Sequence, residues 1–292
     1  MVVLSCFDGM SCGQIALERA GIKVKKYYAS EIDKYAIKVT QANYPNTIQL
    51  GSITEWENWN IEQPDMIIGG SPCQGFSFAG KQLNFEDERS KLFFTFAEII
   101  KHYKPKYFLL ENVKMKKECH EVITNILGVE PIEINSALVS AQNRKRLYWT
   151  NIPNVKQPED KGIFLKDIVE DIKHKYLNDK TAGRCRTMKN IKSVKEKSYT
   201  LTSTMYKMSQ NNGMTNIKDD KGVRCITPLE CERLQTVPDN YTNYVSNTQR
   251  YKMLGNAWTV DVIAHIFRGI RDADGELIDG VEVKELDCYK EC

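Results

Sequence analysis

Two side chains that could do chemistry follow predicted strands in the first half of the chain. Cys73 lies in a loop of small residues, 69–75, whose backbone N–H groups could stabilise a thiolate, so it is a candidate nucleophile. Glu111 follows another predicted strand, 106–110, and would lie beside Cys73 if the two strands are neighbours. A carboxyl buried there could donate a proton. The alternatives are an inert buried thiol and a carboxylate that caps a helix.

The turns after the first two predicted strands have features of a nucleoside site. Residues 7–13 form a glycine-containing turn at the start of a predicted helix, but they lack the GxGxxG pattern of a dinucleotide site. Glu31 follows the second strand, about 20 residues further on, where an acidic side chain suits ribose hydroxyls. We therefore predict a nucleoside without phosphates, although Asp8 and Asp33 could equally be helix caps.

These residues need a sheet that brings the ends of several strands to one edge. Ligands of doubly wound sheets bind beyond the carboxyl ends of the strands. Short β-branched and aromatic runs alternate here with helical patterns, which predicts an α/β fold with a doubly wound, mostly parallel sheet. The predicted strands are 2–7, 25–29, 47–50, 65–69, 106–110, 132–138 and 146–150, and the predicted helices are 11–20, 33–43, 90–103 and 118–127.

The pattern changes twice later in the chain. After residue 151 it becomes polar and lysine-rich, and regular alternation does not resume before residue 222. Residues 227–230 then form a capping box with proline at the first helical position, and 257–270 read as an apolar helix. We predict three segments: a catalytic and cofactor-binding domain at 1–153, a small inserted domain at 154–222, and a C-terminal segment at 223–292 that completes the first domain.

The positive charge of the chain is concentrated in one segment. The 292 residues include 41 Lys and Arg against 38 Asp and Glu, a net charge of +3, which is typical of a globular protein. Residues 173–207, however, hold ten basic and two acidic side chains. Such a segment attracts polyanions, and phosphate contacts supply the sequence-independent part of nucleic-acid affinity. The alternative is a solvated basic face.

Other classes of protein are not expected. No apolar run approaches the length of about 18 residues that a membrane-spanning helix needs, and the first residues lead directly into a strand pattern. This predicts a soluble, unexported, cytoplasmic protein. The nine cysteines lack framework spacing and should be free thiols, and without CxxC motifs the four isolated histidines predict no metal site.

Four motifs resemble those of the DNA (cytosine-5)-methyltransferases in order and spacing. They are Ser-Pro-Cys-Gln at 71–74, Glu-Asn-Val at 111–113, Gln-Asn-Arg-Lys-Arg at 142–146 and Leu-Gly-Asn-Ala-Trp at 254–258. Residues 80–94 look like the catalytic loop of the bacterial enzymes, whereas 7–9 and 245–258 look more like the eukaryotic de novo enzymes. The resemblance fails only over about 155–222. It implies an S-adenosylmethionine-dependent, Rossmann-like methyltransferase of compact bacterial or phage type, with an inserted target-recognition domain.

The resemblance also implies a role for each motif residue. Because carbon 5 of cytosine is a poor nucleophile, the family adds a cysteine thiolate at carbon 6 of the flipped-out base, and Cys73 would form that adduct. Glu111 would keep ring N3 protonated, Arg146 would bind O2, and Arg144 would support Arg146. The methyl donor would be S-adenosyl-L-methionine, which leaves S-adenosyl-L-homocysteine. The residues implied to bind it are Phe7, Asp8, Gly9, Glu31, Ile32, Ser52, Ile53, Pro72, Asn256, Ala257 and Trp258.

Ser52 departs from the family pattern. The family commonly carries an acidic residue here that contacts the adenine amino group, so the affinity for the cofactor could be modest.

Double-stranded DNA is the implied substrate. The residues implied to contact it are Gln74, Phe78, Ala79, Lys81 and Arg89 in the loop that would close over the flipped base, and Arg184, Arg186, Lys189, Ser203 and Lys207 in the basic segment. Which of the latter read bases stays open, because phosphates and base edges are bound by the same residue types. A cognate restriction endonuclease would be a functional rather than a physical partner.

Two rival functions and two assembly states remain. A related branch of the family methylates tRNA, but its Cys-Phe-Thr signature does not occur in this chain. A catalytically silent DNA-binding paralogue has no reason to keep Cys73, Glu111, Arg144 and Arg146. A monomer is expected, with a homodimer through the helix of Phe93 and Phe94 as the alternative.

Overall fold

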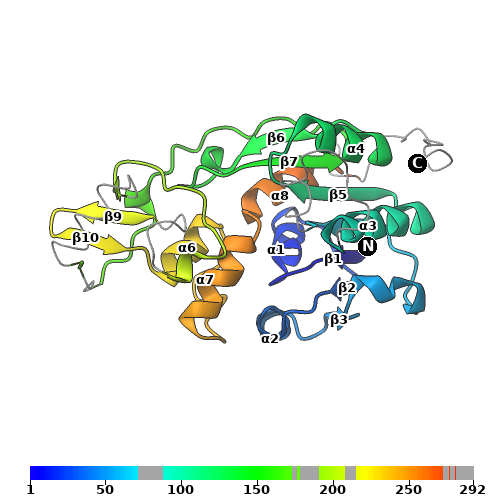
Figure 1. Ribbon diagram of the computed structural model, residues 1–292, viewed down its shortest axis with the longest axis horizontal. Helices are drawn as coiled ribbons and strands as arrows, with labels where there is room; N and C mark the ends of the chain where they lie inside the picture. Colours follow the sequence, from blue (N-terminus) through cyan, green and yellow to red (C-terminus); the bar gives the residue numbers. More distant parts are fainter. Residues whose placement is uncertain are drawn as a thin grey trace.

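A seven-stranded sheet forms the centre of the molecule (Figure 1). The computed structural model describes residues 1–71, 88–172, 176–177, 191–207, 215–271, 276 and 280, with the backbone alone for 88–90. The strands are β1 (Val2–Cys6), β2 (Lys26–Ser30), β3 (Ile48–Gln49), β4 (Met66–Gly69), β5 (Tyr107–Asn112), β6 (Ile132–Asn135) and β7 (Lys145–Thr150), in the order β3-β2-β1-β4-β5-β7-β6. The first five are parallel, and β7 is antiparallel to both of its neighbours. The predicted mostly parallel α/β sheet is confirmed.

Helices cover both faces of this sheet, because the side chains of each strand alternate between two apolar clusters. Val3 of β1 packs with α1 (Cys12–Arg19), α2 (Lys34–Asn43) and α8 (Val260–Arg268). Its neighbour Leu4 packs on the other face with α3 (Glu88–Tyr103) and α4 (Lys117–Leu127). The sheet is therefore doubly wound, and the C-terminal helix α8 covers the same face as the N-terminal helix α1.

A smaller sheet lies at one end of the molecule, beyond α6 (Pro228–Leu234) and α7 (Asn247–Asn256) (Figure 1). Its strands β8 (Ile191–Ser193), β9 (Asn216–Asp219) and β10 (Gly222–Cys225) pair in the order β10-β9-β8. Short 3₁₀ turns connect other elements at η1 (Ile53–Asn58), η2 (Ser136–Leu138), η3 (Leu165–Asp167) and η4 (Met205–Lys207). Strand β10 crosses residue 222, where we placed the end of the inserted domain, and the three-segment division stays a prediction.

Two elements differ from their predicted extents. The strand predicted at 132–138 ends at Asn135, whose side chain accepts a hydrogen bond from the backbone of Ala137 and begins η2. The helix predicted from residue 257 begins at Val260, because Ala257 is extended and its carbonyl oxygen accepts from the side chains of Arg144 and Gln235. Residues 257–259 thus form a link between α7 and α8. The capping box of α6 is present as predicted, with Thr227 and Glu230 bonded to each other's backbone.

Within the described part of the chain, no helix combines the length and the apolar character needed to cross a membrane.

Candidate active site

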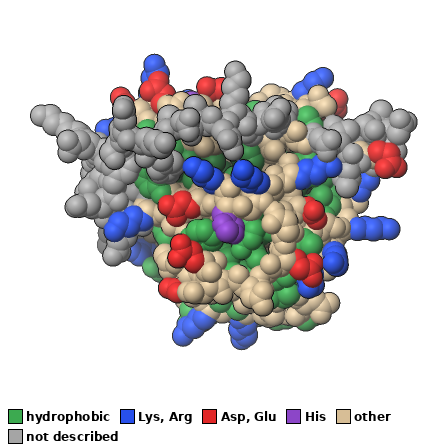
Figure 2. Space-filling model, turned by 90° about the vertical axis from the view of Figure 1, so that its right-hand side faces the viewer, with side chains coloured by type: hydrophobic (Ala, Val, Ile, Leu, Met, Phe, Trp, Pro, Cys, Tyr) green, Lys and Arg blue, Asp and Glu red, His purple; other side chains and the backbone are tan. Residues whose placement is uncertain are grey.

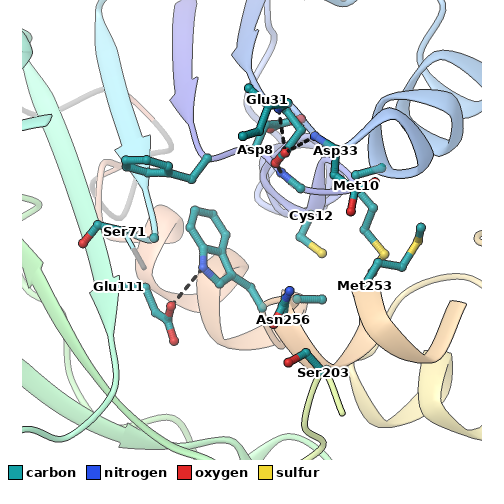
Figure 3. A pocket seen from close by; sticks show the side chains of 18 of the residues that line it. Asp8, Met10, Cys12, Glu31, Asp33, Ser71, Glu111, Ser203, Met253 and Asn256 are labelled. Atoms are coloured by element: carbon teal, nitrogen blue, oxygen red, sulfur yellow. Dashed lines mark hydrogen bonds between the residues drawn. The ribbon is translucent and has the colours of Figure 1, made fainter. Parts of the chain in front are cut away.

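A cavity of about 520 Å³ lies at the carboxyl ends of β1, β2, β4 and β5, where the sequence placed the site. It has two regions that we name separately. The cofactor half lies around Asp8 and Glu31, and the base half lies around Glu111 and Ser71 (Figure 3). The sequence-predicted residues that line the cavity are Phe7, Asp8, Gly9, Glu31, Ile32, Ser52, Ile53, Glu111, Arg144, Arg146, Ser203, Asn256, Ala257 and Trp258.

Ten predicted site residues fall outside what the structure describes. They are Pro72, Cys73, Gln74, Phe78, Ala79, Lys81, Arg184, Arg186 and Lys189, and the side chain of Arg89. Ser71 is the last described residue before Cys73. It lies in the base half, where its hydroxyl accepts a hydrogen bond from Asn112 Nδ2 at 3.3 Å. The condition set in the sequence analysis, that the two strands leading to Cys73 and Glu111 are neighbours, is met, since β4 pairs with β5.

The carboxyl of Glu111 is held between two donors. Its Oε1 lies 2.9 Å from Arg146 Nε, and its Oε2 accepts a hydrogen bond of 3.2 Å from Trp258 Nε1. Glu111 is 8% exposed and belongs to β5, whereas Arg146 comes from the antiparallel strand β7. The register of β5 against β7 brings the two side chains together. Glu111 pairs with Tyr148, and Arg146 lies two residues from Tyr148, on the same face of β7. A carboxylate and a guanidinium thus meet in the cavity wall.

Arg144 does not face the solvent beside Arg146. It is 3% exposed, and its guanidinium donates to the carbonyl oxygens of Leu201 at 3.1 Å, Gly255 at 3.3 Å and Ala257 at 2.9 Å. Burial is the main cause that lowers the pKa of Arg144, to about 10. This pKa is still well above neutral pH, so the guanidinium remains charged. Arg144 therefore ties the segment that carries Leu201 to the link between α7 and α8.

The carboxyl of Glu31 is fixed by its own backbone turn. Its Oε2 accepts from Gly9 N at 2.8 Å, and its Oε1 accepts from Ile32 N and Asp33 N, both at 2.7 Å. Asp33 is a helix cap, since its carboxyl accepts from Tyr35 N at the start of α2. Three backbone donors orient the Glu31 carboxylate toward the cofactor half and leave lone pairs for a ligand's hydroxyls.

Apolar surface surrounds this carboxylate. Ile32 is 77% exposed at the cavity, an unusual position for a large aliphatic side chain, whereas Ile53 is buried in the wall. The hydroxyl of Ser52 caps η1 by accepting from Thr54 N at 3.3 Å, and it also contacts the hydroxyl of Thr54. The serine found where the family commonly has an acidic residue thus has a local structural role.

Asp8 is the most perturbed carboxyl of the site. Removal from water is the largest cause that raises its pKa, to about 6, and the nearby Glu31 adds to this effect. Hydrogen bonds from Ser11 and from Tyr27 Oη, the latter at 2.8 Å, oppose the shift by stabilising the charged form. Asp8 therefore changes its charge between about pH 4 and pH 7.

This shift predicts how the stability of the ligand-free protein depends on pH. Because the pKa of Asp8 is higher in the folded state, its contribution to stability is lost as the pH rises from about 4 through 6. In Asp8→Asn the side chain does not titrate, so this pH-dependent loss of stability does not occur. We expect the difference in unfolding free energy, variant minus wild type, to grow by about 1–2 kcal/mol between pH 4 and pH 7, since Asp8 as a whole residue is half-buried and lines the cavity. Urea unfolding at both pH values measures it, and a difference that stays constant contradicts the assignment.

Helix α7 supplies part of the cavity wall that the sequence analysis missed. Gln249, Lys252 and Met253, which were not predicted, line the cavity together with the predicted Asn256. Their spacing of three, four and seven residues is that of one helix face, and this signal was available beside the motif at 254–258. Lys252 also pairs with Asp33 at 3.1 Å, which joins α7 to the start of α2.

A close approach of two backbones places Ser203 at the cavity. A Cβ atom at Gly255 would lie 2.1 Å from the carbonyl carbon of Thr202 and 2.3 Å from Ser203 N. Residue 255 must therefore be glycine for the segment at 201–203 to pack on the end of α7. Ser203 is the one DNA-contact candidate in the described chain that lines the cavity, whereas Lys207 lies exposed on η4.

One lysine of the basic segment has a structural role. The ammonium of Lys197 donates to the carbonyl oxygens of Ala137, Ser140 at 3.3 Å and Ile163 at 2.8 Å. Lys192, by contrast, is paired with Glu196 at 2.9 Å on the surface. Lys197 thus helps to hold this segment against η2 and the connecting residues 140 and 163.

Comparisons with known proteins give a matching family and relatives that share the sequence and the fold of this chain. A family model described as C-5 cytosine-specific DNA methylase matches residues 1–272. The type II methyltransferase M1.ScrFI of Lactococcus lactis subsp. cremoris is 37% identical, over 82% of this chain and 70% of that protein. The type II methyltransferase M.NlaX of Neisseria lactamica is 31% identical, over 93% of this chain and 96% of that protein. A crystal structure of a Spodoptera frugiperda DNMT2 mutant shares the fold, with a TM-score of 0.69, 22% identity, and coverage of 91% of this chain and 98% of that one.

Proposed function

The chain belongs to the C-5 cytosine-specific DNA methylases, and from this premise we propose which residues bind the cofactor and which take part in the reaction. The enzyme transfers a methyl group from a methyl donor to carbon 5 of cytosine in DNA. We propose that the donor is S-adenosyl-L-methionine, that the substrate is double-stranded, and that the named side chains have the roles set out below.

The cofactor half of the cavity fits such a donor. It offers an oriented carboxylate at Glu31 for ribose hydroxyls and apolar surface at Ile32 and Ile53 for the two faces of an adenine. The turn at Phe7 and Gly9, where φ is +59° and +60°, brings backbone to the cavity for the methionine portion. When bound, the cofactor supplies a methyl group on a positively charged sulfur, an electrophile that an activated carbon 5 can attack.

The base half fits an extruded cytosine. The Cys73 thiolate forms a bond to carbon 6, and the electron pair of the C5–C6 double bond becomes available at carbon 5, which takes the methyl group. Glu111 holds the proton at N3, and the Arg146 guanidinium stabilises the charge that develops on O2. A base then takes the proton from carbon 5, and the electron pair of that C–H bond restores the C5–C6 double bond and expels the cysteine thiolate.

One observation carries this proposal. The residues suited to the nucleoside and the residues suited to the cytosine line one continuous cavity, although they come from separate segments of the chain, 7–53 and 111–146. Incubation of unmethylated genomic DNA with the protein and S-adenosylmethionine, followed by bisulfite sequencing, tests it. Methylated cytosines at one recurrent sequence support the proposal. Methylation of tRNA and not of duplex DNA would overturn it.

The likeness to type II methyltransferases supports a role beside a restriction endonuclease. We propose that residues 173–207 contact the target DNA, with Ser203 nearest to the base. The opposite end of the molecule, shown in Figure 2, has acidic and basic side chains side by side rather than a patch of one sign. We propose a monomer, because Phe93 is fully buried in the core beside Phe96, and the half-buried Phe94 packs against the same apolar cluster.

Cofactor affinity should depend on the Glu31 carboxylate. In Glu31→Gln the amide group presents one acceptor oxygen where the carboxylate has two, so one backbone N–H of the turn loses its partner and the ribose loses a charged acceptor. We expect the Kd for S-adenosylhomocysteine to rise about 10–100-fold, since hydrogen bonds to charged groups contribute about 1.5–3 kcal/mol. Calorimetry measures the Kd. Glu62→Gln, at a surface carboxylate paired with Lys25, is the matched control, and equal affinities of both variants would refute the role of Glu31.

A further inference from the structure

Trp258 contacts both halves of the cavity. Its indole N–H donates to Glu111 in the base half at 3.2 Å. The backbone of Trp258 lies near the thiol of Cys12, which lines the cavity at the start of α1. Its ring also lies against α1, since a Cβ atom at Gly13 would be 3.8 Å from Trp258 Cζ3. One side chain on the link between α7 and α8 therefore spans the distance from the cofactor turn to the catalytic carboxyl.

The contact between indole and carboxyl is closely packed. A Cβ atom at Gly70 would lie 3.0 Å from Trp258 Nε1 and 3.3 Å from Glu111 Oε2. Both groups thus rest on the backbone of Gly70, just after β4, and they fit because this residue has no side chain. The partners come from β5, from the residues after β4 and from the link after α7, so the main fold fixes the contact rather than a surface loop.

Two donors on different elements give the carboxyl one orientation. The terminal torsion of a glutamate is broad, so a carboxyl held by one donor can still turn. Here Trp258 holds Oε2 and Arg146 holds Oε1. In the proposed reaction Arg146 also turns toward the O2 atom of the cytosine, and at that moment the indole is the donor that keeps Glu111 in place.

We propose that Trp258 is a positioning residue that couples the cofactor half of the cavity to the orientation of Glu111. This inference rests on the proposed role of Glu111. It assigns to Trp258 a contribution to turnover that is separate from its place in the cofactor wall.

Trp258→Phe tests the proposal, because phenylalanine keeps an aromatic ring in the cavity wall and removes the N–H. We expect kcat at saturating cofactor and DNA to fall about tenfold, and the Kd for S-adenosylhomocysteine to change by less than about threefold. A loss that appears entirely in cofactor affinity, with kcat unchanged at saturation, would overturn the proposal. Trp258 would then act only as part of the cavity wall.

A double-mutant cycle separates this inference from the proposed function. In a Glu111→Gln background there is no acid to position, so Trp258→Phe should lower kcat by less than about twofold further. A full tenfold loss in that background would also overturn the inference. Normal turnover by Glu111→Gln alone would instead refute the proposed role of Glu111.

Gly70→Ala tests the same contact without altering either partner. The added Cβ should separate the indole from the carboxyl, and we expect a loss in kcat similar to that of Trp258→Phe with the Kd for S-adenosylhomocysteine preserved. Gly70→Ala also keeps the proposal testable if Trp258→Phe does not fold. An unchanged kcat in Gly70→Ala would count against the proposal.

Discussion

Cys73→Ser is expected to lower methyl transfer by about 10⁴-fold or more while leaving DNA binding intact. A hydroxyl ionises far less readily than a thiol, so the variant has almost no anion to add to carbon 6. The hydroxyl is close to the thiol in shape, so the surface that meets the DNA is almost unchanged. Single-turnover transfer of labelled methyl groups measures the first effect, and a gel-shift titration with the substrate DNA measures the second.

Another cysteine of the cavity is poorly suited to replace Cys73. Cys12 lines the same cavity, but burial raises the pKa of its thiol to about 12, so it remains protonated at neutral pH. Cys119→Ser, on helix α4 beyond the far face of the sheet, is the control and should retain turnover within about twofold. Normal turnover by Cys73→Ser would remove the proposed nucleophile.

Glu111→Gln is expected to lower kcat by about 10²–10³-fold, which lies within the usual range of about 10²–10⁴-fold for loss of a general acid. The amide keeps the shape of the side chain, and its oxygen can still accept from Trp258 Nε1, but it has no acidic proton for ring N3. Steady-state transfer at saturating cofactor measures the change. DNA affinity should alter little, because the loss arises in the reaction rather than in binding.

A carboxylate two strands away in the same sheet provides the matched control for this variant. Glu133 of β6 pairs on the surface with Lys114 and Lys145. Glu133→Gln removes one negative charge at a similar place in the sheet, and its kcat should stay within about twofold of wild type. If Glu111→Gln and Glu133→Gln behave alike, Glu111 is not the acid.

The sequence predicted the sheet well because its signals are local. Apolar runs bounded by glycine and proline mark β1, β4 and β5, and parallel strands must present their carboxyl ends at one edge. The position of Glu111 beside the strand that leads to Cys73 follows from that rule. The reversed direction of β7 does not, because a single strand carries no signal for the direction of its partner.

The sequence did not predict which polar side chains hold the fold together and which face a ligand. Arg144 and Arg146 are two residues apart in one motif, yet Arg144 is bonded to three carbonyl oxygens from distant segments while Arg146 meets Glu111. Lys197 belongs to a segment interpreted as facing DNA, but three carbonyl oxygens surround its ammonium. Each of these contacts depends on tertiary packing, which local spacing does not encode.

The contact between Trp258 and Glu111 could not be predicted from the sequence, because it too depends on tertiary packing. The resemblance placed Trp258 in the cofactor wall and Glu111 at the base, and 147 positions separate the two in the chain. Their hydrogen bond follows from the extended link at Ala257, which lay inside a predicted helix.

Trapping of the covalent intermediate tests the central claim most directly. Duplex DNA that carries 5-fluorocytosine in place of cytosine allows the thiol to add and the methyl group to transfer, but a fluorine on carbon 5 cannot leave as a proton does. We predict a complex of protein and DNA that survives denaturing electrophoresis, that requires S-adenosylmethionine, and whose linked peptide contains Cys73. Wild-type protein that methylates ordinary DNA but forms no such complex, or a Cys73→Ser variant that still forms it, would contradict the mechanism.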